Sequence, residues 1–217
     1  MNKVWNALQK ENSILVCDFD TTLTNSGSSM HGLVHVLGED TPFAKDRDRL
    51  FQKYGKKLSL DREIVDEKED ICWWKEQMEL FLKYQITEEM FGQVAKILPV
   101  RREAVELLSK CQTENVPVWI VSAGIANVIE EWLKQQELDA SFFQILANRV
   151  LFTDGSASGY TRSVIPSGKA KRFLKDVNPA FHQHLVFLGD RMEDLGWRKE
   201  NAENFLVDRA SGVVTSV

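Results

Sequence analysis

Residues 14–24 read Ile-Leu-Val-Cys-Asp-Phe-Asp-Thr-Thr-Leu-Thr, and the short apolar run Ile14–Phe19 in this stretch carries two acids at its end. An apolar run of this length, bounded by polar residues, is typical of a buried strand. Asp18 and Asp20 stand two residues apart at its end, and neighbouring carboxylates repel each other unless a cation is present. The alternative is that these acids make a turn or cap a helix. The stretch predicts a strand that ends in acidic side chains.

Three further runs rich in β-branched and aromatic residues predict strands at Val116–Val121, Phe143–Leu151 and His184–Leu188. Helical patterns separate the runs, and strands that alternate with helices imply a parallel sheet covered by helices on both faces. We therefore expect an α/β fold. Asp154-Gly155, followed by Ser156 to Gly159, is a turn signal that predicts a small hairpin running into Thr161–Ile165.

The segment from Asn25 to about Pro99 differs from the rest, because it is dense in charge and contains no convincing strand. The apolar residues that fall at helical spacing in it are Trp73, Trp74, Met78, Phe81 and Leu82. We expect residues 1–24 and 100–217 to form the α/β core and residues 25–99 to form a helical insert.

The composition excludes several classes of protein. It is 43% apolar and 27% charged, as in folded proteins, and a formal net charge of −5 argues against a broad basic face for a nucleic acid polymer or an anionic membrane. Met1 to Lys10 is too polar for a secretory signal, and no apolar run approaches the roughly 20 residues of a membrane helix. We expect a cytoplasmic protein, and the oligomeric state stays open.

The three cysteines, Cys17, Cys72 and Cys111, are odd in number and widely separated. This spacing indicates neither a disulfide framework nor a zinc site. We expect buried thiols, and burial of Cys17 would raise its pKa and make it a poor nucleophile.

Polar residues follow each of the predicted strands, where ligands gather in an open parallel sheet. Three strand endings carry acids, a hydroxyl or glycine, and a lysine, Lys169, follows the remaining run, Phe143–Leu151, after a turn. The three endings are Asp18-Phe19-Asp20-Thr21-Thr22-Leu23-Thr24, Ser122-Ala123-Gly124 and Gly189-Asp190-Arg191-Met192-Glu193-Asp194. Taken singly, each could be a turn or a helix cap, and for Ser122 this reading is equally good. Together they predict one site.

These endings resemble the motifs of the haloacid dehalogenase superfamily: Asp-x-Asp-x-Thr, a Ser or Thr after a strand, a Lys, and Gly-Asp-x-x-x-Asp. All four occur here in order. The segment Val121-Ser122-Ala123-Gly124-Ile125-Ala126-Asn127-Val128-Ile129-Glu130-Glu131 is similar to the pyrimidine 5′-nucleotidase family, and phosphoserine phosphatases are more distant relatives. The resemblance implies a Rossmann-like core with a helical cap between the first two motifs.

The resemblance also implies roles for the residues. Asp18 would attack phosphorus and form an aspartyl-phosphate, and Asp20 would carry the proton. The Ser122 hydroxyl and the backbone N–H groups of Phe19, Asp20 and Ala123 would hold the phosphoryl oxygens, with Gly124 allowing the tight turn.

The implied cofactor is Mg²⁺, which prefers hard oxygen ligands. It would be bound by Asp18, Asp190 and the backbone carbonyl of Asp20. Asp194 would orient a metal-bound water or Lys169. Lys169 follows the turn Pro166-Ser167-Gly168, which favours it over Lys171 and Lys175 as the residue that stabilises the phosphoryl charge.

In the cap, Trp73 and Trp74 align loosely with an aromatic pair that the nucleotidase family uses near the base. The alternative, favoured by their helical spacing with Met78, is that both pack inside the cap. Ser59 stands where the family carries a glutamate that contacts the base, so pyrimidine specificity stays open. Arg101-Arg102 either meets a substrate anion or, as we favour, begins a helix in solvent.

We therefore expect an enzyme that hydrolyses a small phosphate monoester, with nucleoside 5′-monophosphate as the favoured substrate. One alternative is a phosphatase of another small metabolite, similar to phosphoserine phosphatase, or a phosphotransferase that uses an acceptor alcohol. Another, of a different class, is an inactive protein that keeps the phosphate pocket for binding or scaffolding.

Overall fold

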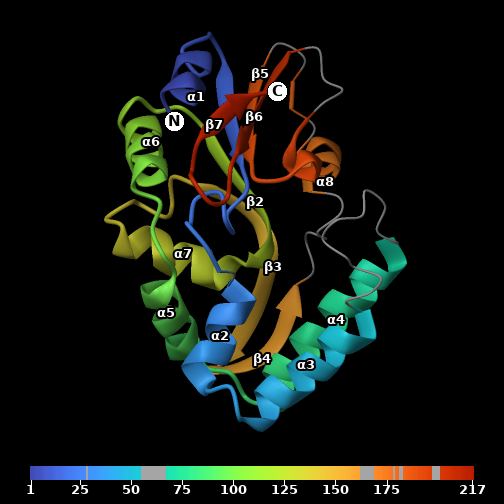
Figure 1. Cartoon of the computed structure of the whole chain (residues 1–217). Helices are drawn as coiled ribbons and strands as arrows, with labels where there is room; N and C mark the ends of the chain where they lie inside the picture. The colour runs from blue at the N-terminus through green and yellow to red at the C-terminus, as the bar shows by residue number, and fades with distance from the viewer. Residues whose placement is uncertain (28, 55–66, 162–168, 178, 181–182, 197–200) are drawn as a thin grey trace.

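The computed structural model describes the chain except at residues 28, 55–66, 162–168, 178, 181–182 and 197–200, and at the side chains of residues 67 and 169–172. The helices are α1 (Asn2–Ala7), α2 (Ser29–Leu37), α3 (Pro42–Tyr54), α4 (Glu67–Lys83), α5 (Glu88–Ile97), α6 (Arg102–Thr113), α7 (Ala126–Gln135), α8 (Lys169–Asp176) and a short 3-10 helix, Met192–Asp194. The strands are β1 (Ser13–Cys17), β2 (Val118–Ile125), β3 (Gln144–Thr153), β4 (Ser156–Thr161), β5 (His184–Gly189), β6 (Ala202–Val207) and β7 (Val214–Ser216) (Figure 1).

The described strands form one sheet in the order β4-β3-β2-β1-β5-β6-β7. The five inner strands are parallel, whereas β4 and β7 run antiparallel at the two edges. This confirms the expected α/β fold. β1 lies between β2 and β5, so the chain continues on opposite sides of β1, and such a switch point leaves a crevice beyond the carboxyl end of the strand. Asp18 directly follows β1 at this point.

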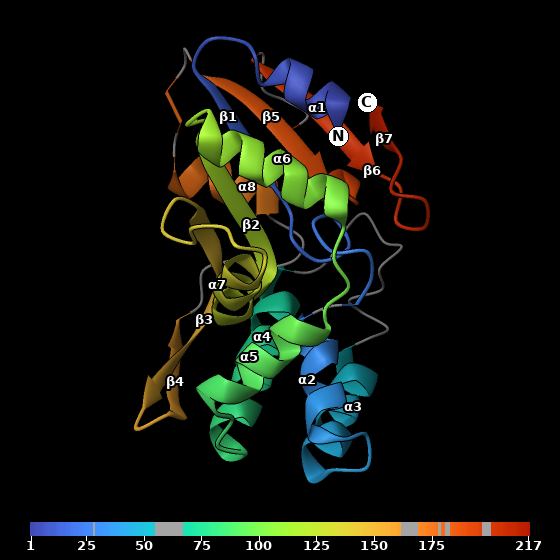
Figure 2. The same ribbon diagram turned by 90° about the vertical axis from the view of Figure 1, so that its left-hand side faces the viewer.

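Helices α2, α3, α4 and α5 gather beyond one end of the sheet (Figure 2). The chain enters and leaves this helical part at adjacent points, because Thr24 and Val100 form a β-bridge and the Asn25 N–H donates to the Pro99 carbonyl at 3.0 Å. The predicted helical spacing is confirmed in α4, where Trp74, Met78 and Phe81 are buried. The division into a core and a cap at residues 24/25 and 99/100 stays a prediction.

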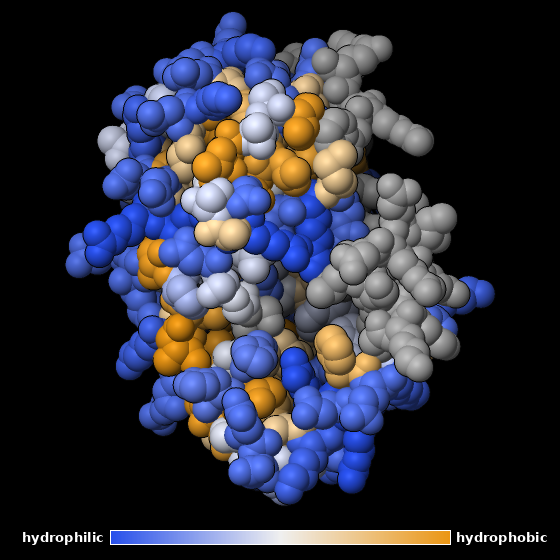
Figure 3. Space-filling model, in the orientation of Figure 1, coloured by the Kyte–Doolittle hydropathy of each residue, from blue (hydrophilic) through white to orange (hydrophobic). Residues whose placement is uncertain are grey.

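The surface in Figure 3 carries a band of strongly hydrophilic residues across its middle, between the sheet and the helical part. Apolar surface lies on either side of that band. Within the described part of the chain, every helix is too short or too polar to cross a bilayer.

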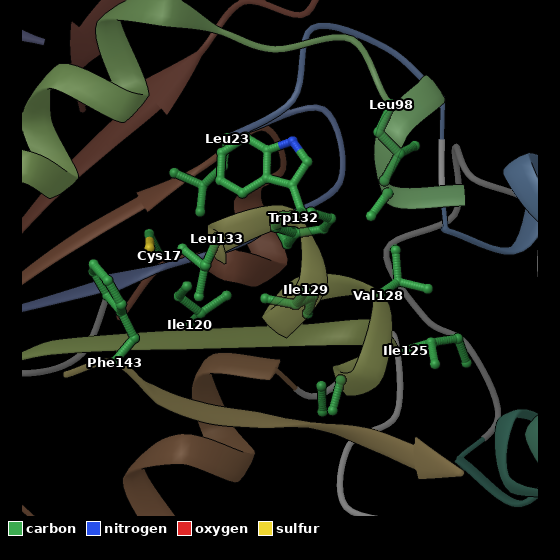
Figure 4. Packing of buried hydrophobic residues seen from close by; sticks show 14 of the residues in the cluster. Cys17, Leu23, Leu98, Ile120, Ile125, Val128, Ile129, Trp132, Leu133 and Phe143 are labelled. Atoms are coloured by element: carbon green, nitrogen blue, oxygen red, sulfur yellow. The ribbon is translucent and has the colours of Figure 1, made fainter. Parts of the chain in front are cut away.

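Alternate residues of β1 enter two separate apolar cores. Leu15 and Cys17 belong to one core with α1, α6 and α7, whereas Ile14 and Val16 belong to a second core with Phe173 of α8. Figure 4 shows the side chains of α7 in the first core, above the strands of the sheet. Both faces of the parallel strands are therefore buried, which explains why their sequences read as continuous apolar runs.

Two parts of the sheet differ from the expectations. The patterns do not predict β6 or β7, because β6 begins with Ala-Glu-Asn and leaves an apolar run of three residues, Phe205-Leu206-Val207. The second strand of the hairpin is predicted too late: Asp154-Gly155 alone makes the turn, with positive φ at both residues, and β4 already begins at Ser156. Residues 162–165 of the expected strand lie outside the described part.

The cysteines are correctly predicted in two of three cases. Cys17 and Cys111 are buried, and burial raises the pKa of both thiols, that of Cys111 to about 12. Cys72 is exposed. It lies on α4 two positions before Trp74, and two positions turn a helix by more than half a circle, so the buried face does not include it.

Candidate active site

Asp18 is held at the centre of the sheet edge. Its N–H donates to the Leu188 carbonyl of β5 at 3.0 Å, which extends the parallel pairing beyond β1, and the residue is 3% exposed. Phe19 is completely buried, with its ring 5.3 Å from that of Trp132, so any contact of Phe19 with a ligand is restricted to its backbone. The first acid of the Asp-x-Asp motif is therefore buried at the end of β1, and the middle residue of the motif packs in the core.

Three acids from two strand endings converge. One carboxylate oxygen each from Asp18, Asp190 and Asp194 lies within 4.8 Å of the others. The Thr21 hydroxyl donates to Asp190 Oδ2 at 2.7 Å, and Thr22 donates to Asp18 Oδ2 at 3.2 Å. A set of carboxylate oxygens is the donor type that Mg²⁺ and Ca²⁺ prefer, so these residues fit a hard divalent cation.

Two further residues, Arg209 and Gly189, help to hold these three acids close together. Arg209, in the connection between β6 and β7, forms an ion pair with Asp190 that the sequence patterns do not predict. At Gly189, an added Cβ atom would lie 2.3 Å from the Cβ of Asp194. Only glycine therefore permits the close approach of Asp194 to the end of β5.

Asp20 faces the other way. Its carboxylate accepts the Ser29 N–H of α2 at 3.2 Å and lies outside the group formed by the other three acids. A Cβ atom added at Gly124 would lie 2.7 Å from Ser29 Oγ and 3.1 Å from both Asp20 Oδ2 and Ser122 Oγ. Asp20, Ser29 and Ser122 thus meet in the space that a side chain at position 124 would fill. The expected metal contact of Asp20, through its backbone carbonyl, stays a prediction.

The segment Ser122-Ala123-Gly124 is the irregular end of β2, where the pairing with β3 shifts register between Val121 and Ile125. The strand was predicted to end at Val121, but it continues to Ile125. Buried Asn148 of β3 donates its amide to the Ala123 carbonyl at 2.7 Å. Asn148 is a supporting residue that the strand pattern gives no reason to select.

The loop after Asp20 is strained and clamped. Thr21 has a φ of 64°, which β-branched residues rarely adopt. The Arg101 guanidinium, which is 4% exposed, donates to the carbonyls of Thr21 at 3.2 Å, Thr22 at 3.0 Å and Thr24 at 3.5 Å. Arg102 is exposed as expected, but the expectation for Arg101 is wrong, because its partners are backbone carbonyls that no side-chain pattern reveals.

Lys169 is the first residue of α8, and its side chain lies outside the described part of the chain, as does that of Lys171. Its predicted role therefore stays a prediction. Ser59 also lies outside the described residues.

The two cap tryptophans line a pocket of about 170 Å³ that also reaches Asp20 and Gly124. Trp74 is buried, and Trp73 is half-buried with its ring 5.8 Å from that of Phe51. The two rings thus pack in the cap and also line the pocket beside Asp20, and their contact with a substrate stays a prediction.

The fold and the residues at its strand endings define a phosphatase of the haloacid dehalogenase type. More specifically, residues 21–204 match the family described as Pyrimidine 5′-nucleotidase (UMPH-1), and the chain belongs to that family.

A 7-methylguanosine phosphate-specific 5′-nucleotidase of Gallus gallus is 26% identical over 200 residues, which cover 83% of this chain and 68% of that protein. The chain spans about two thirds of the length of the curated relatives it matches. The structure of cytosolic 5′-nucleotidase IIIB bound to cytidine superposes with a TM-score of 0.71 at 20% identity, covering 95% of this chain and 78% of that one. A substrate-bound phosphoserine phosphatase has a TM-score of 0.56 at 17% identity, covering 86% and 81%.

Proposed function

We propose that the protein hydrolyses nucleoside 5′-monophosphates in the presence of Mg²⁺, through a phosphoaspartate on Asp18. The observation that carries this proposal is the separation of the two acids after β1. Asp18 lies with the acids Asp190 and Asp194, whereas the Asp20 carboxylate and the Ser122 hydroxyl lie together beside Gly124. One carboxylate thus lies where a cation keeps it ionised, and the other lies apart from the cation, where it can carry a proton.

In the first step, a carboxylate oxygen of Asp18 attacks phosphorus while the bond from phosphorus to the 5′-oxygen breaks. Asp20 gives its proton to the departing oxygen. In the second step, a water attacks the phosphorus of the phosphoaspartate, its proton passes to Asp20, and the bond from Asp18 to phosphorus breaks. Inorganic phosphate leaves and both acids regain their starting states, with the proton transfers contributing about 10² to 10⁴ in rate.

Short, fixed donors hold the phosphoryl group during both steps. These are the Ser122 hydroxyl and the N–H groups of Phe19, Asp20 and Ala123, with Lys169 adding positive charge. The bond from Asn148 to the Ala123 carbonyl supports this role, because it fixes the peptide planes of the irregular end of β2. Donors that are fixed before the reaction stabilise developing charge without the cost of reorganisation.

Asp18 and Asp190 would hold the metal ion with the backbone carbonyl of Asp20, and Asp194 would orient a water or Lys169. When bound, Mg²⁺ neutralises charge on the phosphoryl oxygens. The three-acid group supports this assignment, and its all-oxygen donors favour Mg²⁺ over softer metals.

The substrate class is supported by the pocket beside Asp20. Its lining includes aromatic rings from α3 and α4, which suits a flat leaving group. Relatives of the chain are named for a nucleotide, and the similar solved structure contains a nucleoside. A nucleoside 5′-monophosphate places its phosphate at the acids and its base at the rings.

The test is phosphate release by wild type, Asp18→Asn and the control Asp154→Asn, with and without Mg²⁺. Asp154 is an exposed acid in the β3–β4 turn, and asparagine tolerates its positive φ. We expect Asp18→Asn to lose all Mg²⁺-dependent release with an unchanged circular dichroism spectrum, and the control to keep it. Acid-quenched wild type should carry the mass of one phosphoryl group, which Asp18→Asn should lack. A fully active Asp18→Asn variant would rule out this nucleophile.

The substrates should include pyrimidine and purine monophosphates, phosphoserine and a sugar phosphate. An added nucleoside or alcohol separates hydrolysis from phosphotransfer, because transfer forms a new ester at the expense of free phosphate. Folded wild type that releases phosphate from none of these esters would contradict the proposed function and favour an inactive binding protein.

A further inference from the structure

The pocket beside Asp20 contains a cation, Arg47 of α3, among its aromatic residues. The lining includes Asp20 and Gly124, where the proposed function places the phosphate. It also includes the rings of Phe51 and Trp73. A leaving group that extends from the phosphate toward the rings therefore comes next to the Arg47 guanidinium.

The Arg47 guanidinium packs on an aromatic ring and forms one ion pair. Its central carbon lies 5.5 Å from the centre of the Phe51 ring, and Nη1 forms an ion pair with Asp48 at 2.9 Å. The Arg47 side chain is 18% exposed. Nε is buried, and the described residues offer it no hydrogen-bond acceptor. A ligand therefore meets the exposed part of the guanidinium, where a carbonyl oxygen can accept a charge-assisted hydrogen bond.

The charge of Arg47 stays in effect inside the pocket. The guanidinium group is a permanent cation. Its partner Asp48 does not line the pocket and has a side chain 61% exposed, where water screens the carboxylate and weakens the pair. A bound ring therefore meets π-faces together with a fixed positive charge.

We propose that Arg47 determines base specificity: the pocket accepts uncharged nucleobases that present a carbonyl oxygen and rejects a base with a positively charged ring. This inference rests on the proposed function. N7-methylated guanine is such a cationic base, because methylation gives its ring a positive charge. In this respect the chain differs from the relatives that are named for 7-methylguanosine phosphate.

The physical reason is that two opposing effects act on the methylated base. Aromatic walls attract a cationic ring through their π-faces. The fixed charge of Arg47 repels the same ring at short range in a partly desolvated pocket, where water screens little. For an unmethylated base the repulsion is absent, and its carbonyl oxygen accepts a charge-assisted hydrogen bond. Arg47 therefore turns an aromatic wall that would favour the cation into one that disfavours it.

The experiment compares guanosine 5′-monophosphate with 7-methylguanosine 5′-monophosphate, which differ by one methyl group and its charge. Mildly acidic buffer keeps the N1 proton on the methylated ring. The variants are Arg47→Met, which keeps a linear apolar stem without charge, and Arg47→Lys, which restores the charge alone. Arg49→Met is the matched control, because Arg49 lies on the same helix with its side chain 76% exposed. Thermal unfolding verifies that each variant is folded.

We expect wild type and Arg49→Met to prefer the unmethylated nucleotide by about tenfold or more in kcat/KM. Arg47→Met should bring the ratio close to one or invert it, and Arg47→Lys should recover part of the preference. Wild type that prefers the methylated nucleotide, or a ratio unchanged in folded Arg47→Met, would overturn the inference.

Calorimetric titration with guanosine and 7-methylguanosine tests the pocket without chemistry. We expect wild type to bind guanosine more tightly, and Arg47→Met to lose that difference. If the nucleosides show this pattern but no nucleotide is hydrolysed, the proposed function fails and the binding specificity stands. If nucleotides are hydrolysed and Arg47→Met changes both substrates equally, the specificity assignment fails and the proposed function stands.

Discussion

The two walls of the candidate site are stabilised by different interactions. The wall from the sheet consists of short polar side chains that hold one another, as when Thr21 donates to Asp190 and Thr22 donates to Asp18. The wall from α3 and α4 consists of rings, and here Arg47 Nε and Trp74 Nε1 are buried without acceptors among the described residues. The sheet wall thus fixes the geometry of the reaction in advance, whereas the helical wall offers ring faces and the charge of Arg47 to a ligand.

Among the residues that support the site without reacting, the largest effect should come from the clamp on the sheet wall. Arg101→Met removes three hydrogen bonds to the carbonyls of the strained loop after Asp20. A misplacement of about 1 Å at a reacting group can cost about 10² in rate, so we expect kcat to fall about 10²-fold with little change in KM. Steady-state kinetics measure this. Arg102→Met, a change at the exposed neighbouring arginine, should be close to wild type. A folded Arg101→Met variant with kcat within twofold of wild type would contradict the clamp.

A second prediction separates the two regions by thiol chemistry. Cys72 on α4 is exposed, whereas burial raises the pKa of Cys17, directly before Asp18, and of Cys111. Only the thiolate reacts readily, so Cys72 should be alkylated at least about tenfold faster than the other two. Peptide mass spectrometry after brief treatment of the native protein identifies the labelled residue. Early modification of Cys17 would show that the core opens more easily than its packing indicates.

On the helical wall, the expected change is in binding rather than chemistry. Trp73→Leu removes a half-buried ring from the pocket beside Asp20. A stacking ring contributes roughly 1 kcal/mol, so we expect KM for a nucleotide to rise about fivefold with kcat nearly constant. Ribose 5-phosphate, which lacks a base, serves as the matched substrate and should respond little. A fall in kcat without a rise in KM would contradict the assignment of the helical wall to substrate binding.

The smallest effect concerns the packing of α3 on α4. Asp46 accepts hydrogen bonds from Lys83 and Tyr84, both at 2.6 Å, and chiefly the Lys83 bond lowers its pKa from 3.8 to about 2. A lowered folded-state pKa stabilises the protein above pH 3.8, and this contribution is lost as the pH falls toward 2. Asp46→Asn should lower Tm by about 1 °C at neutral pH. The deficit should shrink at pH about 3. A deficit equal at both pH values would assign the effect to packing.

The sequence predicts the acids of the site because they follow apolar runs, and the parallel arrangement of those runs brings their ends together. It does not predict that Asp18 and Asp20 diverge. Residues two apart share a face in a strand, but β1 ends at Cys17, and the loop geometry sends Asp20 toward Ser29. This divergence is a property of the loop, which residue type alone does not encode.

Other parts escape prediction for different physical reasons. Arg101 and Asn148 act on backbone carbonyls, which every residue has, so no partner side chain marks them. Arg209 pairs with Asp190 because β6 and β7 bring the end of the chain back to the site, and neither strand has a clear pattern. In the helical part, spacing predicts the buried face of α4 but not which ring also borders the pocket.

The position of β1 in the sheet has a consequence for how the protein is made. β1 pairs with β2 on one side and with β5 on the other, so Ser13 finds its partner only when His184 has left the ribosome. Until then an apolar strand stays open along one edge, and open edges are where nascent chains associate wrongly. The segment that bears the reactive acid is thus synthesised early and completed late, and a chain truncated before β5 should aggregate rather than fold.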